Sequence, residues 1–336
     1  MARKKIYGGI DIGGTKIRMG LVDSRGRVFF HKMFLTPVRK PWENTLDLLV
    51  NNFHEMIGEA DTSYADLSGI GIGCPGTFDK TRENIRFAPN LEWRNIPIKA
   101  YLNDRFPVPV FFENDTNLST LGVANYGEGR GKKAIIGIFI GTGIGGGIIV
   151  DKELFIGSTG GAGEIGHMVI RENGPKCHCG NRGCLESIAS TSAIYDRIHR
   201  QYRRRYKQTE TYADFTANAN KSLAVRKAYY SGEKTAAAII EDAFSSLGMG
   251  LVSLINLFNP DMIVLGGGLM EALGEVILEK TVSVVKESAM PGTYEKVQIV
   301  KTRLGDDAPI VGGAALVEHY LKIPAAYTEE SGLKQI

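Results

Sequence analysis

Three cysteines and a histidine near the middle of the chain have the spacing of a metal site. The cysteines are Cys177, Cys179 and Cys184, and His167 lies ten residues before the first of them. Three thiolates and one imidazole are a common ligand set for structural zinc. The short step between the first two cysteines and their odd number argue against disulfide bonds. The sequence therefore predicts a Zn²⁺ site formed by these four residues, with His178 as an alternative nitrogen ligand.

Two glutamates flank this predicted zinc knuckle. Glu164 precedes His167 by three residues, and Glu186 follows Cys184 by two. Four protein ligands leave tetrahedral zinc without an open position, which argues against hydrolytic chemistry at the metal. We therefore expect a structural zinc that holds both glutamates and His167 toward a polar ligand. The alternative is a glycine-rich loop with incidental thiols.

A glycine turn near the N-terminus is a candidate phosphate-binding site. The segment DIGGTK joins two strands, so it predicts a β-hairpin rather than the strand–loop–helix of a Walker motif. Glycines let backbone N–H groups approach phosphate oxygens, although glycine turns in hairpins also occur for purely structural reasons. The acid that precedes the turn is suited to the water shell of Mg²⁺. The candidate residues are Asp11, Gly13, Gly14, Thr15 and Lys16.

An internal repeat strengthens this interpretation. Residues Ile10–Asp23 align without a gap to residues Ile138–Asp151, at an offset of 128. The repeat predicts two similar α/β halves, each with a glycine hairpin that faces a ligand. Phe139 replaces the acid in the second copy, so only the first copy offers a group for Mg²⁺. The second turn adds the candidate residues Gly141, Thr142 and Gly143.

Polar residues follow several predicted strands. The strand Val108–Phe112 leads into ENDTN, and the strand Leu67–Cys74 leads into Gly76. Ligands of α/β proteins usually bind beyond the carboxyl ends of strands, which favours a functional role for Asn114 and Asp115. The alternative is that Asp115 or Thr116 caps the next helix. Residues 88–93 are expected to form a polar loop, in which Asn90 is a candidate ligand or a turn residue after Pro89.

The second half of the chain predicts further helices and a third glycine turn. Thr235–Phe258 is amphipathic at helical spacing. The strand Asp261–Leu265 opens into Gly266, Gly267 and Gly268, a turn suited to an adenine nucleotide. Residues 198–221 are expected to form a solvated helix and loop, whose basic run at 203–207 lies on the surface or contacts phosphate or nucleic acid. The last predicted helix is Ile310–Leu321.

Length, charge and cysteine use limit the class of protein. A chain of 336 residues predicts two domains. The net charge of +3 is too small to indicate a nucleic-acid partner. No run was expected to reach the length of a membrane span, and the first ten residues lack the features of a signal peptide. Reduced thiols then predict a cytoplasmic protein, with Cys74 as a core residue.

The segments GEIGHM and CHCGNRGCLE together resemble the signature of the ROK family of sugar kinases and sugar-responsive repressors, and within it the glucokinases. The resemblance extends through nearly the whole chain. It implies an α/β, two-domain actin/hexokinase-like (ribonuclease H-like) ATPase fold with the active site in the interdomain cleft. The expected domains are a small α/β domain of residues 1–118 and 309–323, a large α/β domain of residues 119–308 with the knuckle at 167–184, and a tail of residues 324–336.

The resemblance also implies roles for the candidate residues. Asp115, in the END-x-N motif, is the expected general base, although Thr116 stands where alanine is commoner. The three glycine turns hold ATP, and Asp11 acts on the Mg²⁺ shell. The expected product is the 6-phosphate of a hexose, most simply glucose. The implied sugar-binding residues are Gly76, Asn90, Asn114, Asp115, Glu164, His167 and Glu186.

Other readings remain open within this family. A transcriptional repressor binds sugar without phosphorylating it, but the first hairpin begins within ten residues of Met1, which leaves no room for a preceding helix-turn-helix domain. The acceptor can instead be fructose, mannose or an N-acetylhexosamine, and the donor polyphosphate or ADP. Relatives imply a homodimer or homotetramer.

Overall fold

The computed structural model describes residues 5–37, 40–205 and 210–322. These residues form two compact units. Unit 1 contains residues up to 131, residues 147–163 and residues from 306 onward, and unit 2 contains residues 132–146 and 164–305. The expected tail of residues 324–336 lies outside the described residues, and so do Tyr206 and Lys207 of the basic run.

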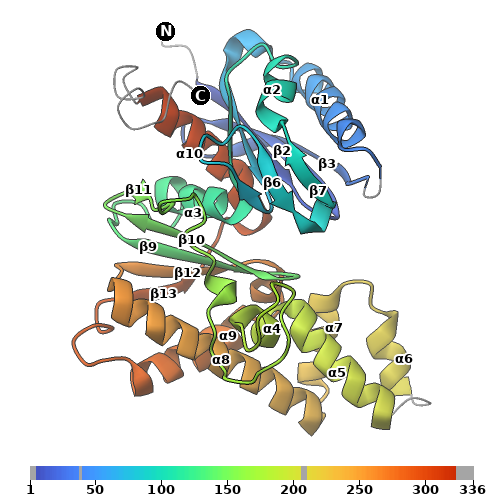
Figure 1. Ribbon diagram of the computed structural model, residues 1–336, viewed down its shortest axis with the longest axis vertical. Coiled ribbons are helices and arrows are strands. Elements are labelled where there is room, and N and C mark those ends of the chain that lie inside the picture. Colours follow the sequence, from blue (N-terminus) through green and yellow to red (C-terminus); the bar gives the residue numbers. More distant parts are fainter. Residues whose placement is uncertain (1–4, 38–39, 206–209, 323–336) are drawn as a thin grey trace. The chain divides into compact units, whose positions relative to one another are not determined.

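The main sheet of unit 1 has the strand order β3-β2-β1-β4-β8 (Figure 1). The first three strands form an antiparallel meander, and β4 and β8 run parallel to β1. The carboxyl ends of the three parallel strands therefore share one edge of the sheet. The strands are β1 (Ile6–Ile12), β2 (Lys16–Asp23), β3 (Val28–Leu35), β4 (Leu67–Cys74) and β8 (Val110–Asn114).

A small antiparallel sheet contains the polar loop expected at residues 88–93 as the connection between two of its strands. It consists of β5 (Thr77–Phe78), β6 (Ile85–Ala88) and β7 (Trp93–Ile96), and a 3₁₀ turn at Pro89–Leu91 joins the last two. Leu91 and Trp93 are buried in the core of unit 1. The loop prediction is confirmed apart from its two end residues, whereas the strands around it were not predicted, because strands of four residues are too short to show a clear alternation of polar and apolar side chains.

Helices cover both faces of the main sheet of unit 1. Gly8 and Gly9 are neighbours in β1, so their Cα hydrogens point to opposite faces. A Cβ on Gly8 would lie 2.7 Å from the Phe53 ring of α1, and one on Gly9 would lie 2.0 Å from the carbonyl oxygen of Ile310 in α10. These helices therefore pack on opposite sides. The helices of unit 1 are α1 (Trp42–Glu59), α2 (Ile98–Asn103), α3 (Asp115–Tyr126) and α10 (Ala308–Lys322).

The second sheet repeats the strand order of the first. Its order is β11-β10-β9-β12-β13, in which β12 runs parallel to both β9 and β13. In chain order, the first two strands of each sheet form a glycine hairpin, and the first of these strands also has a parallel neighbour in the sheet. The repeat predicted from the sequence is confirmed, and with it the α/β fold class. The strands are β9 (Ile135–Ile140), β10 (Ile144–Val150), β11 (Glu153–Leu154), β12 (Met262–Gly266) and β13 (Gln298–Lys301).

Six described helices belong to unit 2, and α8 and α9 run side by side in it (Figure 1). The solvated helix and loop expected at residues 198–221 are wrong in part, because α5 buries Ile198 and Tyr202 against its neighbours. The six helices are α4 (Leu185–Ala189), α5 (Thr191–Arg205), α6 (Glu210–Ala217), α7 (Lys221–Tyr230), α8 (Lys234–Phe258) and α9 (Gly268–Ser288).

Helix α8 is long and apolar enough to cross a bilayer by length and composition alone, so the expectation that no run approaches that length was wrong. However, 61% of its most apolar window is buried inside the protein. It packs against α4, α5 and α9. These contacts account for its apolar composition as that of a core helix.

Candidate active site and metal site

The first glycine turn is stabilised by a hydrogen bond within its own backbone and by another from a neighbouring loop. Gly13 N–H donates to the Lys16 carbonyl at 2.9 Å, and the Thr36 hydroxyl donates to the Gly13 carbonyl at 2.6 Å. A Cβ at position 13 would lie 2.7 Å from the Lys16 carbonyl oxygen. Glycine is therefore required for this tight hairpin. Thr15 and Lys16 are exposed beside it.

Asp11 lies at the end of β1 in a strongly charged environment. It is 8% exposed, and its Oδ2 lies 3.5 Å from Nη1 of Arg18, its partner across the hairpin. The other guanidinium nitrogen, Nη2, lies 2.8 Å from Asp306 Oδ2. Burial raises the pKa of Asp11 to about 7, and the negative charge of Asp115 adds to this increase while Arg18 opposes it. Two acidic groups so close together form a favourable place for a cation.

The junction of β8 and α3 places Asp115 at the first position of a helix. Asn114 is the N-cap, and its Oδ1 accepts hydrogen bonds from the backbone N–H groups of Thr116 and Asn117 at 3.0 and 3.3 Å. The expectation that Asp115 or Thr116 caps the helix was therefore wrong by one residue. The Thr116 hydroxyl also donates to Asn114 Oδ1, at 2.7 Å. Asp115 Oδ1 also accepts from the backbone N–H of Thr116, at 2.9 Å, but Asn114 accepts from both N–H groups and is the N-cap.

Two further candidate sugar-binding residues of unit 1 lie next to these groups. Gly76 has a φ of +106°, and its carbonyl oxygen accepts from Asn114 Nδ2 at 3.3 Å. Asn90 lies against the first glycine turn, since a Cβ on Gly14 would be 3.0 Å from the Asn90 carbonyl oxygen. The structure therefore brings together Asp11, Gly13, Gly14, Gly76, Asn90, Asn114 and Asp115 within unit 1.

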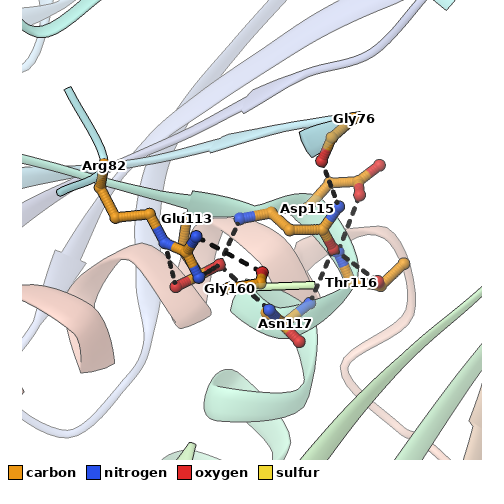
Figure 2. Close-up of polar contacts among 8 residues, drawn as sticks. Gly76, Arg82, Glu113, Asp115, Thr116, Asn117 and Gly160 are labelled. Carbon is orange, nitrogen blue, oxygen red and sulfur yellow. Dashed lines mark hydrogen bonds and ion pairs between the residues drawn. The ribbon is translucent and has the colours of Figure 1, made fainter. Parts of the chain in front are cut away.

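A buried ion pair beneath α3 was not anticipated from the sequence. Arg82 and Glu113 are each 3% exposed. Arg82 Nε donates to Glu113 Oε2 at 3.1 Å, and Nη2 lies 3.1 Å from Oε1 (Figure 2). Arginine is usually exposed, so the residue type alone does not indicate that Arg82 is buried in an ion pair. The residues DKTREN around it indicate only a turn, in which Asp79 accepts hydrogen bonds from Glu83 and Asn84.

The second glycine turn belongs to unit 2 and contacts Glu186. The Glu186 Oε2 accepts from the backbone N–H of Ile144 at 2.9 Å. A Cβ on Gly143 would lie 2.3 Å from the same oxygen. The backbone N–H of Thr191 donates to the Gly141 carbonyl at 3.0 Å. Glu186, expected as a sugar ligand, thus also fixes the turn that contains Gly141, Thr142 and Gly143.

The third glycine turn connects β12 to α9. Gly266 ends the strand, Gly267 is the N-cap with a φ of +90°, and Gly268 begins the helix. A Cβ on Gly267 would lie 2.6 Å from the Ile140 carbonyl oxygen, so this turn approaches the end of β9 closely. The N-terminus of α9, a helix of 21 residues, offers backbone N–H groups suited to an anion.

The four predicted metal ligands converge in unit 2. The ligand atoms of His167, Cys177, Cys179 and Cys184 all lie within 4.8 Å of one another. His167 Nδ1 is 3.6 Å from Cys177 Sγ, and the sulfurs of Cys179 and Cys184 are 3.7 Å apart. Zinc–sulfur bonds of about 2.3 Å and zinc–nitrogen bonds of about 2.0 Å in a tetrahedron require edges of about 3.8 and 3.5 Å. The cluster therefore fits a tetrahedral zinc ion, and His178 is not part of it.

The environment of the thiols also favours a cation. Burial raises the pKa of the Cys184 thiol to about 12, and the neighbouring thiols add to this effect. Burial likewise raises the pKa of Cys177. A thiolate at these positions needs a positive charge beside it. His167 Nε2 lies 3.9 Å from Glu164 Oε2, which is beyond hydrogen-bond distance, while His167 Nδ1 faces the sulfur of Cys177.

Known proteins similar to this chain fall into one family. The model of the ROK family matches residues 7–320. A glucokinase from Thermotoga maritima is 33% identical, over 92% of this chain and 96% of the relative. A xylose repressor from Bacillus spizizenii is 34% identical, over 94% of this chain and 78% of the repressor. Both kinases and repressors are therefore among the relatives.

A solved structure with the same fold was determined with a sugar and a nucleotide bound. It is a ROK family glucokinase from Streptomyces griseus in complex with glucose and AMPPNP. The TM-score is 0.78 at 29% sequence identity, covering 94% of this chain and 99% of that one. The similarity thus extends over nearly the full length of a sugar kinase.

Proposed function

Because the chain belongs to the ROK family, we propose that it is an ATP-dependent hexose kinase that converts D-glucose to glucose 6-phosphate. One observation carries the proposal most directly. At the shared carboxyl edge of β1, β4 and β8, the capped start of α3 presents Asp115 close enough to Asp11 for its charge to raise the pKa of that residue. A general base and a cation-binding acid side by side are what phosphoryl transfer to a hydroxyl requires.

In the proposed reaction, Asp115 accepts the proton of the attacking sugar hydroxyl as the oxygen attacks the γ-phosphorus of ATP. The bond from that phosphorus to the bridging oxygen breaks, and ADP leaves. Asn114 and Gly76 position the hydroxyl from unit 1 together with Asn90. Glu164, His167 and Glu186 are the sugar-binding residues that unit 2 contributes. Carboxylates and amides suit this task because each sugar hydroxyl both donates and accepts hydrogen bonds.

The nucleotide is assigned to the three glycine turns. Backbone N–H groups in the first and second turns bind phosphate oxygens, with Thr15, Lys16 and Thr142 as further donors, and Gly266–Gly268 contact the adenosine. Bound Mg²⁺ neutralises charge on the transferred phosphoryl group. The residue on this chain that would hold its water shell is Asp11, which lies close enough to Asp115 for the negative charge of Asp115 to raise its pKa.

A structural zinc ion is assigned to His167, Cys177, Cys179 and Cys184. The observed edges of 3.6 and 3.7 Å match a closed tetrahedron, which supports a role in folding rather than in the chemical step. By fixing the ring of His167, the ion orients Glu164 on the other side of that ring. Thiols that bind zinc rather than form disulfides are consistent with a cytoplasmic enzyme.

A replacement at Asp115 tests the assignment. We expect Asp115→Asn to lower kcat about 1,000-fold or more, because the amide cannot accept the proton. The dissociation constant for glucose, measured by calorimetry, should change little, since a similar side chain fills the same space. The assay couples ADP release to a panel of hexoses that includes glucose, fructose, mannose and N-acetylhexosamines. A variant with near-normal kcat excludes Asp115 as the base.

A second function is supported by the repressors among the relatives. Xylose repressors are 31–34% identical to this chain over at least 92% of its length. A sugar-responsive regulator binds its sugar but turns over no ATP. Glucose binding together with ADP formation indicates a kinase, whereas glucose binding without detectable ADP formation indicates a regulator. A mobility-shift experiment with operator DNA tests the regulator directly.

A further inference from the structure

The buried residues Arg82 and Glu113 form a bridge between a turn and the start of α3. Arg82 approaches Glu113 with two nitrogens, each 3.1 Å from a different carboxylate oxygen. Nε makes a hydrogen bond and Nη2 makes an ion-pair contact without hydrogen-bond geometry, and together they hold the carboxylate in place. Arg82 is itself constrained, because it lies at a φ of +59° in the turn that Asp79 organises. The pair is thus anchored at both ends.

Glu113 transmits this constraint to the residues around Asp115. Its Oε1 accepts from the backbone N–H of Asn114 at 2.8 Å and from Asn117 Nδ2 at 3.0 Å (Figure 2). Asn114 in turn accepts from Thr116 and Asn117 as the helix cap. Asn114, which precedes Asp115, is therefore held by the Glu113 carboxylate. Thr116, which follows Asp115, is held by the side chain of Asn114.

The same guanidinium also contacts a second segment of unit 1. Arg82 Nη1 donates to the Gly160 carbonyl at 3.5 Å. Gly160 has a φ of +82°, and a Cβ there would lie 2.6 Å from Nη1. Only glycine combines this backbone conformation with the close approach. Gly160 precedes Glu164 by four residues in the chain.

We propose that Arg82 is a positioning residue for the phosphoryl transfer: through Glu113 it fixes the Asp115 carboxylate, and through Gly160 it is itself held against a second segment of unit 1. This inference rests on the proposed function. Arg82 does not touch the substrate. Its removal frees Glu113 to move and leaves a buried negative charge next to Asn114, so the base is displaced from the attacking hydroxyl.

Kinetic analysis of Arg82 variants tests the proposal. We expect Arg82→Met to lower kcat about 100-fold, the effect of a misplacement of about 1 Å, with a change in the glucose dissociation constant below about threefold. Arg82→Lys keeps the positive charge but cannot contact Glu113 with two nitrogens. Its kcat should therefore lie between those of Arg82→Met and the wild type. The double variant Arg82→Met/Glu113→Gln removes both charges. It should fold better than Arg82→Met while remaining slow, which separates misplacement from unfolding.

Lys99 provides the matched control. It is 7% exposed, and its Nζ lies 3.6 Å from Glu83 in the same turn as Arg82. Lys99→Met removes a buried cation of unit 1 that is paired with Glu83 rather than with Glu113, so kcat per folded molecule should stay unchanged. If Arg82→Met loses no more kcat per folded molecule than Lys99→Met, Arg82 has only a structural role. The wild type and Asp115→Asn, assayed in parallel, separate the outcomes. A wild type that forms no ADP with any hexose overturns the proposed function, and an active Asp115→Asn overturns the assignment of the base. An inactive Asp115→Asn with an active Arg82→Met overturns only the positioning role.

Discussion

Asp11 combines burial with a neighbouring negative charge, and this gives the protein a specific dependence on pH. Burial raises its pKa to about 7 from an ordinary value of 3.8, and Asp115 adds to the increase. The folded state therefore binds this proton more tightly than the unfolded chain does. Consequently, this group's contribution to the free energy of unfolding is fully present below about pH 4 and is lost as pH rises through about 7.

We predict that Asp11→Asn removes this dependence. A shift of this size corresponds to at most about 4 kcal/mol between acidic and alkaline pH. Urea unfolding between pH 5 and 8, in the presence of a chelator and without nucleotide, should show the wild type losing stability relative to the variant as pH rises. Parallel profiles for the two proteins would show that Asp11 does not titrate in this range.

At the scale of elements, the predicted zinc knuckle lies beside two groups of proposed functional residues within unit 2. Its ligand His167 lies 3.9 Å from Glu164. Glu186, two residues after the ligand Cys184, accepts from the second glycine turn at Ile144. The knuckle therefore connects the proposed sugar-binding carboxylates to a proposed phosphate-binding turn. Its loss should affect both substrates.

Metal removal tests this connection. The purified protein should contain about one zinc ion per chain, as four ligands of one tetrahedral site require. Chelation or Cys184→Ser should lower the melting temperature and weaken the binding of both glucose and ATP, and zinc but not magnesium should restore the chelated protein. Cys74→Ala is the control, because Cys74 is buried outside the cluster. Full zinc content in Cys184→Ser would exclude the predicted ligand set.

For the molecule as a whole, the last described helix completes a unit that begins at the other end of the chain. Helix α10 packs on β1, β4 and α3 of unit 1. The contact is a close one between backbones: a Cβ on Gly313 would lie 2.7 Å from the Gly71 carbonyl oxygen and 2.8 Å from the Gly9 Cα. Glycines at all three positions therefore allow the helix to lie directly on the sheet.

The same substitution at two glycines should have opposite effects on stability. Gly313→Ala forces apart backbones that cannot easily move, and we expect a loss of about 1–3 kcal/mol. Gly58 lies in α1 with open space around it, so Gly58→Ala should gain about 0.5–1 kcal/mol from the higher helix propensity of alanine. Denaturant unfolding measures both. A stabilised Gly313→Ala would show that α10 does not approach the sheet so closely.

The features predicted correctly from the sequence depend on local patterns. The glycine turns at Gly13 and Gly141 recur at a fixed offset, and the structure shows the same strand order around each of them. The spacing of Cys177, Cys179 and Cys184 indicated a cluster that the structure brings together with His167. Such patterns are readable because residue type and spacing alone determine turn geometry and ligand reach.

The features that the sequence did not reveal depend on residues distant in the chain. Nothing near Arg82 indicates that its partner is Glu113, and nothing near Gly160 indicates a guanidinium beside it. The choice of Asn114 rather than Asp115 as the cap also depends on how β8 delivers the chain to α3. Sequence alone determined the family, the repeat and the four residues of the predicted metal cluster. Only the tertiary structure decided what surrounds the proposed base, because buried polar pairs form between segments that folding, and not sequence proximity, brings together.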